Sequence, residues 1–414
     1  MSSARPRILV IDEALPWPAD SGKRIRTSAL LTRLASDFDI TLAYHDEGNT
    51  PAEGIEAARA AGLKLLPVKR RPLVKKGLRF AWDLARNVVH RAPYMVMGHR
   101  TQPMRAAIAQ ALASAEPPDL VHVEWTPLVA NVPADARVPV AISAHNVEAD
   151  IWRRYRENEK RFLHRAYIGL QHKKVARFER EALGAADVVT AVSEHDGRRI
   201  GSWSGQPHVE VVPNGVDATW FAPCPDVPVQ PEEVVFVGAL DWRPNQDGME
   251  WFLADVLPRV RLERPDVRLT IVGRAPPEAL AARWQRLPGV EVHGSVPDVR
   301  PFMARGAAFV VPLRIGGGSR LKICEALSMG RPVVSTSVGA EGLELGDGLL
   351  RADTAADFAT AVLGVLADPD AATTMAARGQ ARVLTSYEWD VIAPHQARAW
   401  RDAIQRGPRG ARTS

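Results

Sequence analysis

The alternation of short apolar runs with longer amphipathic stretches is the sequence feature that most restricts the fold of this chain. Runs rich in Val, Ile and Leu are typical of strands, and the stretches between them carry the helical period. Strands joined through helices pair in parallel, so the pattern predicts doubly wound α/β sheets. The first series of expected strands covers Arg7–Asp12, Asp39–Tyr44, Lys64–Val68, Asp119–Glu124, Val138–Ser143, Asp187–Val192 and His208–Val212. The second series covers Val234–Gly238, Val267–Gly273, Val290–His293, Ala307–Pro312 and Pro332–Thr336.

A proline-rich segment separates the two series. Residues 213–231 contain five prolines in nineteen positions, a density that neither a helix nor a central strand tolerates. We therefore expect an N-terminal domain over 1–212, a linker over 213–231 and a C-terminal domain over 232–389. Two such Rossmann-like domains facing each other across a cleft would bind a ligand at the carboxyl ends of their strands.

Composition agrees with a soluble globular protein of the cytoplasm. Apolar residues make up 46% of the 414 positions and charged residues 24%. Cys224 and Cys324 are the only cysteines, which excludes a disulfide framework and favours a reducing compartment. The N-terminus leads directly into an apolar strand, so we expect neither a signal peptide nor a transmembrane segment.

The net charge of +5 is concentrated in two basic stretches, Lys69–Trp82 and Arg153–Arg180. Two interpretations remain open for them. One is a solvated helix face, and the other is a surface for an anionic membrane or an anionic acceptor, at the inner face of the cytoplasmic membrane. Nucleic acid is not expected as a partner, because no zinc-finger, homeodomain or aromatic RNA-binding signature accompanies the charge.

The segment from Val310 to Thr336 carries the strongest chemical signal. It reads as a strand, a glycine loop, a helix and a further strand. Three glycines, Gly316, Gly317 and Gly318, allow close backbone approach to a ligand, and Ser319 is a good helix N-cap. Arg320 and Lys322 follow in the first turn, where cations oppose the helix dipole unless an anion joins them. The pattern therefore predicts a phosphate site.

Glu325 lies on the same helix face as Lys322, among apolar neighbours where a carboxylate needs a partner. A ribose diol is a suitable partner. The simpler alternative is that the glycine run is only a turn and that Lys322 and Glu325 form an ordinary surface ion pair.

This segment, together with Val235–Gln246 and Val290–Val299, closely resembles the family 4 retaining glycosyltransferases of the GT-B type. The resemblance extends over nearly the whole chain and is most specific in the second half. It implies that Glu325 holds the donor ribose, that Arg320 and Lys322 hold the diphosphate, and that the loop of Gly316, Gly317, Gly318 and Ser319 meets the sugar. It further implies that His293 to Val296 line the nucleobase, and it makes Arg274 a candidate donor ligand.

The first half resembles the same family more loosely. Pro16–Arg24 looks like the loop after the first strand, in which Gly22 would let the backbone reach the donor, with Lys23 and Arg24 in support. Ser143-Ala-His-Asn looks like the segment whose histidine faces the transferred sugar, so His145 is the candidate at the catalytic centre. A hydrogen-bonded turn is the simpler interpretation of His145. The segment from Tyr387 resembles the start of the final helix, about 390–414, which in this fold returns to the first domain.

The chain departs from the family pattern at two places. Many relatives carry a glutamate where this chain has Gly317, and many carry Arg and Lys after the first strand of the second domain, where this chain has Ala239. The first departure removes a side-chain contact to the sugar. The second shifts the neutralisation of phosphate onto Arg320 and Lys322.

The expected function is therefore transfer of a sugar from a UDP- or GDP-sugar to an acceptor hydroxyl, an activity of EC 2.4 type, in bacterial polysaccharide, glycolipid or envelope glycan synthesis. We expect retention through front-side attack, with the leaving diphosphate as base. Neither metal nor cofactor is expected, because the D-x-D pairs at Asp37 and Asp368 fit capping and turn positions. The alternatives are a nucleotide-sugar 2-epimerase and a catalytically silent partner subunit.

Overall fold

The computed structural model describes residues 5–72, 77–315 and 321–409. The chain forms two compact units. The N-terminal unit comprises Met1–Pro213 with Ile392–Ser414, and the C-terminal unit comprises Asn214–Val391. Most of the segment expected as a linker therefore packs with the C-terminal unit. Its Val216 is buried and exchanges backbone hydrogen bonds with Tyr387 and Trp389.

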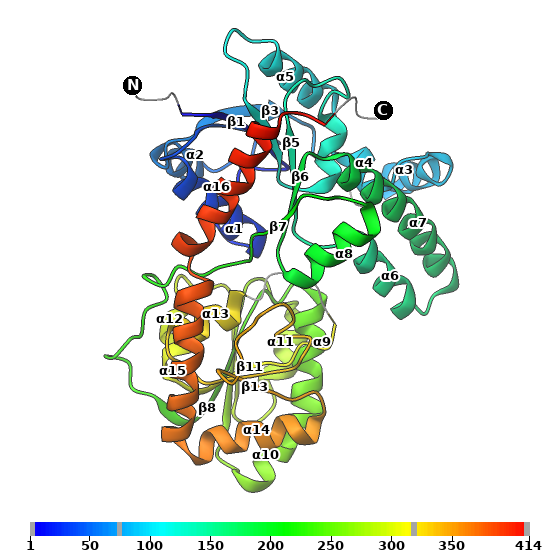
Figure 1. Ribbon diagram of the computed structural model, residues 1–414. Helices are drawn as coiled ribbons and strands as arrows, with labels where there is room; N and C mark the ends of the chain where they lie inside the picture. The colour runs from blue at the N-terminus through cyan, green and yellow to red at the C-terminus, as the bar shows by residue number, and fades with distance from the viewer. Residues whose placement is uncertain (1–4, 73–76, 316–320, 410–414) are drawn as a thin grey trace. The chain divides into compact units, whose positions relative to one another are not determined.

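The N-terminal unit is built on a seven-stranded sheet in the order β3-β2-β1-β4-β5-β6-β7, in which every pair is parallel (Figure 1). The central strands are buried along their length because helices cover both faces, which explains their continuous apolar runs. Its strands are β1 (Arg7–Asp12), β2 (Asp39–Asp46), β3 (Lys64–Lys69), β4 (Leu120–Val123), β5 (Val140–Ala144), β6 (Val188–Ala191) and β7 (Val209–Val211). Its helices are α1 (Gly22–Leu34), α2 (Ala52–Ala60), α3 (Gly77–Val89), α4 (Tyr94–His99), α5 (Gln102–Leu112), a 3-10 turn (Thr126–Asn131), α6 (Glu148–Asn158), α7 (Phe162–Ala185) and α8 (Glu194–Ser204).

The C-terminal unit repeats this plan with six parallel strands in the order β10-β9-β8-β11-β12-β13. Its strands are β8 (Gln230–Val237), β9 (Arg268–Val272), β10 (Val290–His293), β11 (Gly306–Val311), β12 (Val333–Ser335) and β13 (Leu350–Arg351). Its helices are α9 (Arg243–Trp251), a π turn (Phe252–Val256), α10 (Leu257–Glu263), α11 (Glu278–Gln285), α12 (Arg300–Arg305), α13 (Leu321–Ser328), α14 (Ala355–Ala367) and α15 (Pro369–Ser386). The final helix, α16 (Trp389–Arg406), starts in this unit and continues in the N-terminal unit. The two doubly wound α/β sheets confirm the fold class expected from the alternating pattern.

Three local features were not fully specified by the sequence pattern. Residues 147–183, which the pattern predicts as one long or broken helix, form two helices, α6 and α7, with a break at residues 159–161. The helix expected over Asn245–Leu262 contains a π turn just before Pro258, where proline removes a backbone donor. The two-residue strand β13 has no apolar run long enough to predict it.

Helix α16 belongs to the N-terminal unit from Ile392 onward, and Trp400 anchors it there. The Trp400 ring is fully buried and meets the rings of Phe38 and His122 edge-on, both at 5.2 Å between centroids. Its indole N–H donates to His122 Nδ1 over 3.1 Å. A salt bridge between Arg401 and Asp37 lies nearby at the surface.

Replacing this anchor tests how strongly the C-terminal helix stabilises the N-terminal unit. We expect Trp400→Ala to lower the free energy of unfolding by about 3–5 kcal/mol, because a large buried aromatic side chain is lost. Trp82→Ala is the matched control, since the Trp82 side chain is exposed. It should change stability by less than about 0.5 kcal/mol. Denaturant unfolding of both variants provides the measurement, and equal shifts would contradict this role for Trp400.

Candidate functional site

The carboxyl ends of the strands in the C-terminal unit are held together by their backbones. Gly238 N–H donates to Val272 O over 2.9 Å, and Gly273 N–H donates to His293 O over 3.0 Å. A Cβ atom at Gly273 would lie only 1.7 Å from Gly238 O, so no other residue fits at that position. This contact fixes the start of the loops that follow β8, β9 and β10.

Lys322 lies at the point in the sheet where the direction of winding reverses. Helix α13 follows β11, and β11 pairs with β8. The Lys322 ammonium donates to Asn245 Oδ1 over 2.9 Å and lies 4.5 Å from the centroid of the Phe236 ring. A Cβ atom at Gly238 would come within 2.6 Å of the Lys322 ammonium, so glycine provides the room for it. Ligands of open α/β sheets bind at this reversal point, at the carboxyl ends of the strands.

Glu325 stands one helical turn after Lys322 in α13. Burial raises the pKa of its carboxyl to about 7, and the nearby Lys322 charge only partly opposes this rise. Within the described residues, the Glu325 side chain accepts no hydrogen bond. A carboxylate with this surrounding is stabilised by a ligand that donates hydrogen bonds, such as a diol.

The other expected donor ligands lie farther along the same edge. Arg274 follows β9, is half exposed and pairs with Asp241 at 3.3 Å. The next residue, Ala275, has a φ of 47°, a strained conformation that redirects the chain after Arg274. His293 ends β10 and rests its ring 4.7 Å from that of Phe302. Val296 is partly buried against the core of the unit.

Five of the expected site residues lie outside the described part of the chain: Gly316, Gly317, Gly318, Ser319 and Arg320. Of the remaining ones in this unit, Lys322 and Glu325 lie together on α13. His293 lies at the end of β10, and Arg274 and Val296 lie on loops at the same edge of the sheet.

The N-terminal unit places His145 directly after β5, beside a buried carboxylate. His145 Nε2 lies 3.0 Å from Glu124 Oε2 and 2.7 Å from the Glu124 carbonyl oxygen. His122 Nε2 lies 3.1 Å from the other oxygen, Glu124 Oε1. Because the Trp400 indole donates to His122 Nδ1, the proton of His122 is on Nε2.

Two histidine N–H groups therefore hold Glu124 as a carboxylate. Burial by itself would raise the pKa of Glu124, but the hydrogen bonds from His122 and His145 lower it well below its usual range. His145 Nε2 faces two acceptors and must carry its proton. This arrangement leaves Nδ1 as the ring atom of His145 that is available to a ligand.

Gly22 begins helix α1 without a positive φ, so left-handed backbone freedom is not what places glycine there. The adjacent cations are already neutralised. Lys23 donates to Asp12 Oδ1 over 2.5 Å and to Glu13 Oε1 over 2.9 Å, and Arg24 pairs with Asp20. Burial opposes the charge on Lys23, but these two carboxylates raise its pKa above the usual value. The support of a donor phosphate by Lys23 and Arg24 stays a prediction, and in this structure both side chains pair with carboxylates of their own unit.

Sequence reasoning missed two positioning residues. Asn245 is in the first turn of α9 and orients Lys322 while its own amide donates to Ala239 O. Glu179 of α7 accepts the backbone N–H groups of Glu148 and Ala149, at 2.8 and 2.9 Å, and so caps the helix that follows His145. Asn245 belongs to the quoted stretch Val235–Gln246, but nothing in the sequence near Glu179 indicates its partner.

The pairs first considered as metal-binding motifs have structural partners. Asp368 caps α15, as expected, by accepting the N–H of Ala371 over 2.9 Å. Asp37 pairs with Arg401, and Asp39 pairs with Lys64. As for membrane insertion, no helix within the described ranges combines the length and apolar character that a bilayer span requires.

Two family models match this chain. Residues 22–220 match the model described as Glycosyltransferase Family 4, and residues 231–368 match the model described as Glycosyl transferases group 1. Among curated relatives, the chain is 33% identical over 206 residues to a phosphatidyl-myo-inositol mannosyltransferase of Mycolicibacterium smegmatis, covering 47% of this chain and 52% of that protein. It is 31% identical over 251 residues to a GDP-mannose-dependent alpha-(1-6)-phosphatidylinositol monomannoside mannosyltransferase of the same species, covering 54% and 64%.

Solved structures resemble the chain along its full length. Sucrose-phosphate synthase from Thermosynechococcus elongatus superposes with a TM-score of 0.74 at 17% identity, covering 97% of this chain and 100% of that one. Anabaena HepE in complex with UDP and glucose superposes with a TM-score of 0.63 at 13% identity, covering 94% and 98%. At these identities the likeness concerns the fold, which is GT-B. The two family models together span most of the chain, and the chain belongs to the family 4, group 1 glycosyltransferases.

Proposed function

We propose that this protein transfers a sugar from a nucleoside-diphosphate sugar to an acceptor hydroxyl group. The observation that carries the proposal is the Lys322 ammonium, oriented by Asn245 at the reversal point of the sheet, with the partly buried Glu325 carboxyl one turn away. The name of one relative specifies GDP-mannose, and the structure of HepE was solved in complex with UDP and glucose. Both UDP- and GDP-sugars are therefore candidate donors.

In this proposal each donor group has its own partner. Lys322 and Arg320 bind the diphosphate, Glu325 accepts hydrogen bonds from the ribose hydroxyls, and Gly316, Gly317, Gly318 and Ser319 meet the sugar through their backbone. His293 to Val296 line the base, and Arg274 adds a second cation. Fixed charges near the departing diphosphate stabilise the negative charge that develops in the transition state. The proposed chemistry needs no cofactor beyond the donor substrate.

We propose retention of configuration at the anomeric carbon. The bond from that carbon to the diphosphate oxygen breaks while the bond to the acceptor oxygen forms on the same face. The acceptor proton passes to the departing phosphate oxygen, so no protein nucleophile is needed. His145, held by Glu124 through Nε2, presents Nδ1 to a hydroxyl of the transferred sugar and acts as a catalytic residue by orienting it.

The acceptor is proposed to be a hydroxyl of a lipid-linked or envelope glycan at the cytoplasmic face of a membrane. Support comes from two relatives whose names state that they act on phosphatidylinositol and on its monomannoside. Incubation with UDP- and GDP-sugars, with and without glycolipid acceptors, tests the proposal. A donor isomerised without acceptor would identify a 2-epimerase, and an inverted anomer in the product would exclude the retaining mechanism.

Lys322→Ala tests the anion site. We expect a loss of about 10²–10³-fold in kcat/KM, because a charge that stabilises the leaving diphosphate is removed. Lys64→Ala is the control, since Lys64 forms an exposed pair with Asp39 on a different sheet. Steady-state kinetics and UDP or GDP titration provide the measurement. Unchanged binding and rate in Lys322→Ala would contradict the assignment.

The pH dependence of nucleotide binding tests Glu325. The free carboxyl has a pKa of about 7, and hydrogen bonds from ribose favour the carboxylate and lower that pKa in the complex. Binding therefore releases a proton, so affinity is full above pH 7 and falls by up to about tenfold per unit below it. Calorimetric titration should show this slope for the wild type and a flat profile for Glu325→Gln. A slope that persists in Glu325→Gln would show that another group titrates.

His145→Ala tests the proposed sugar contact. We expect kcat to fall by about 10²-fold, because a sugar that is no longer held in the reactive orientation reacts more slowly. Binding of free UDP or GDP should be unchanged, because the residues proposed for it belong to the C-terminal unit. A parallel loss of nucleotide binding and activity would instead indicate that the substitution disrupts folding.

A further inference from the structure

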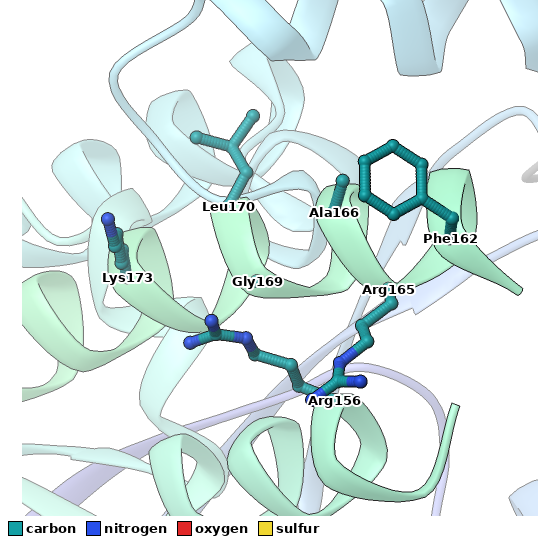
Figure 2. A pocket seen from close by; sticks show the side chains of 7 residues that line it. All are labelled: Arg156, Phe162, Arg165, Ala166, Gly169, Leu170 and Lys173. Carbon is teal, nitrogen blue, oxygen red and sulfur yellow. The ribbon is translucent and has the colours of Figure 1, made fainter. Parts of the chain in front are cut away.

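The hairpin of α6 and α7 contains a pocket of about 460 Å³ that the proposed transfer reaction does not use (Figure 2). Three cationic side chains, Arg156, Arg165 and Lys173, line it together with the apolar Phe162 and Leu170. No acidic side chain is among its lining residues. Within the described residues, none of the three cations forms a salt bridge.

The packing of the hairpin brings cationic side chains from both helices into one pocket. Arg156 of α6 reaches across α7 beside Gly169, where an added Cβ would lie 3.2 Å from Arg156 Nε. Figure 2 shows Arg165 extending from α7 toward the same end of α6. Like charges arranged around an apolar floor repel one another, and an anion placed among them relieves that repulsion.

The rim of the pocket is apolar and exposed. Phe162 and Leu163 open helix α7 with 81% and 77% of their surface exposed. These two apolar side chains and the neighbouring cations form an amphipathic surface. Surfaces of this composition bind at the boundary between lipid headgroups and acyl chains.

We propose that this α6–α7 pocket binds the phosphate of an anionic lipid headgroup, while Phe162 and Leu163 enter the outer boundary of the bilayer. Arg156 and Arg165 contact the phosphate oxygens, and Lys173 adds a further charge at the far end of the pocket. The inference goes beyond the proposed transferase activity and does not depend on it, since it concerns a pocket within the N-terminal unit alone.

A second exposed apolar surface in the same unit provides a rival site. Helix α3 carries Leu78, Trp82 and Val89 on one stripe, with exposures of 91%, 66% and 89%. Gln171 of α7 donates to Asn87 of α3 over 2.6 Å, so the two helices are joined. The α6–α7 pocket is preferred because its three cations and its apolar residues line one cavity, and no acidic side chain is among its lining residues.

Co-sedimentation of the full-length protein with vesicles tests the proposal in the absence of donor and acceptor. We expect binding to phosphatidylcholine vesicles that contain phosphatidylglycerol, and little binding to phosphatidylcholine alone. Each cation near such a surface contributes about 1 kcal/mol, so Arg156→Ala with Arg165→Ala should weaken binding by roughly 25-fold. Phe162→Ser with Leu163→Ser should also weaken it, and added salt should weaken the wild type.

The matched controls are Arg382→Ala and Leu262→Ser, at exposed positions of the C-terminal unit, and both should bind as the wild type does. Unchanged binding of either pocket variant, or loss only in Leu78→Ser with Trp82→Ser, would overturn the proposal. A different result would also overturn it: the wild type binds no vesicles but is stabilised by inorganic phosphate, and the double arginine variant loses this stabilisation. That result would assign the pocket to a soluble ligand. UDP and GDP titration of each variant checks folding independently.

Discussion

The close backbone contact between Gly238 and Gly273 is the constraint on which the candidate donor site depends. Because no side chain separates the ends of β8 and β9, the adjoining loops start in register, and the space above Gly238 stays open for the Lys322 ammonium. Asn245 and the Phe236 ring then hold that ammonium at the reversal point of the sheet. A larger residue at either glycine would displace the charge before any ligand arrived.

The N-terminal unit contains a buried carboxylate, Glu124, whose negative charge must be stabilised by hydrogen bonds. Glu124 is fully buried, and the N–H groups of His122 and His145, together with the Thr27 hydroxyl, stabilise its negative charge there. The chain of contacts runs on from His122 to the indole of Trp400 in the C-terminal helix. The orientation of His145 therefore depends on a residue more than 250 positions away in sequence, which links the stability of the last helix to the candidate catalytic centre.

Much of the fold was predictable from local patterns, because buried parallel strands are continuous apolar runs and need no partner information to be recognised. The bounds of β1 and β10 agree with the expected strands to the residue. The position of the break between α6 and α7 and the short strand β13 were harder to predict from sequence, because each depends on what packs against it. The proline-rich segment looked like a free linker, yet Val216 pairs with the backbone near Tyr387 through a contact with no local signal.

The sequence by itself determined the two α/β units, the family resemblance and the choice of Lys322, Glu325 and His145 as candidates, since glycine loops, helix starts and strand ends are local features. Tertiary structure alone decided which groups those residues face. It paired Lys23 with Asp12 and Glu13, set Asn245 beneath Lys322, and placed Glu179 at the start of α6. Hydrogen bonds of this kind join residues 10 to 77 positions apart, and their energy depends on burial and distance, which no local pattern encodes.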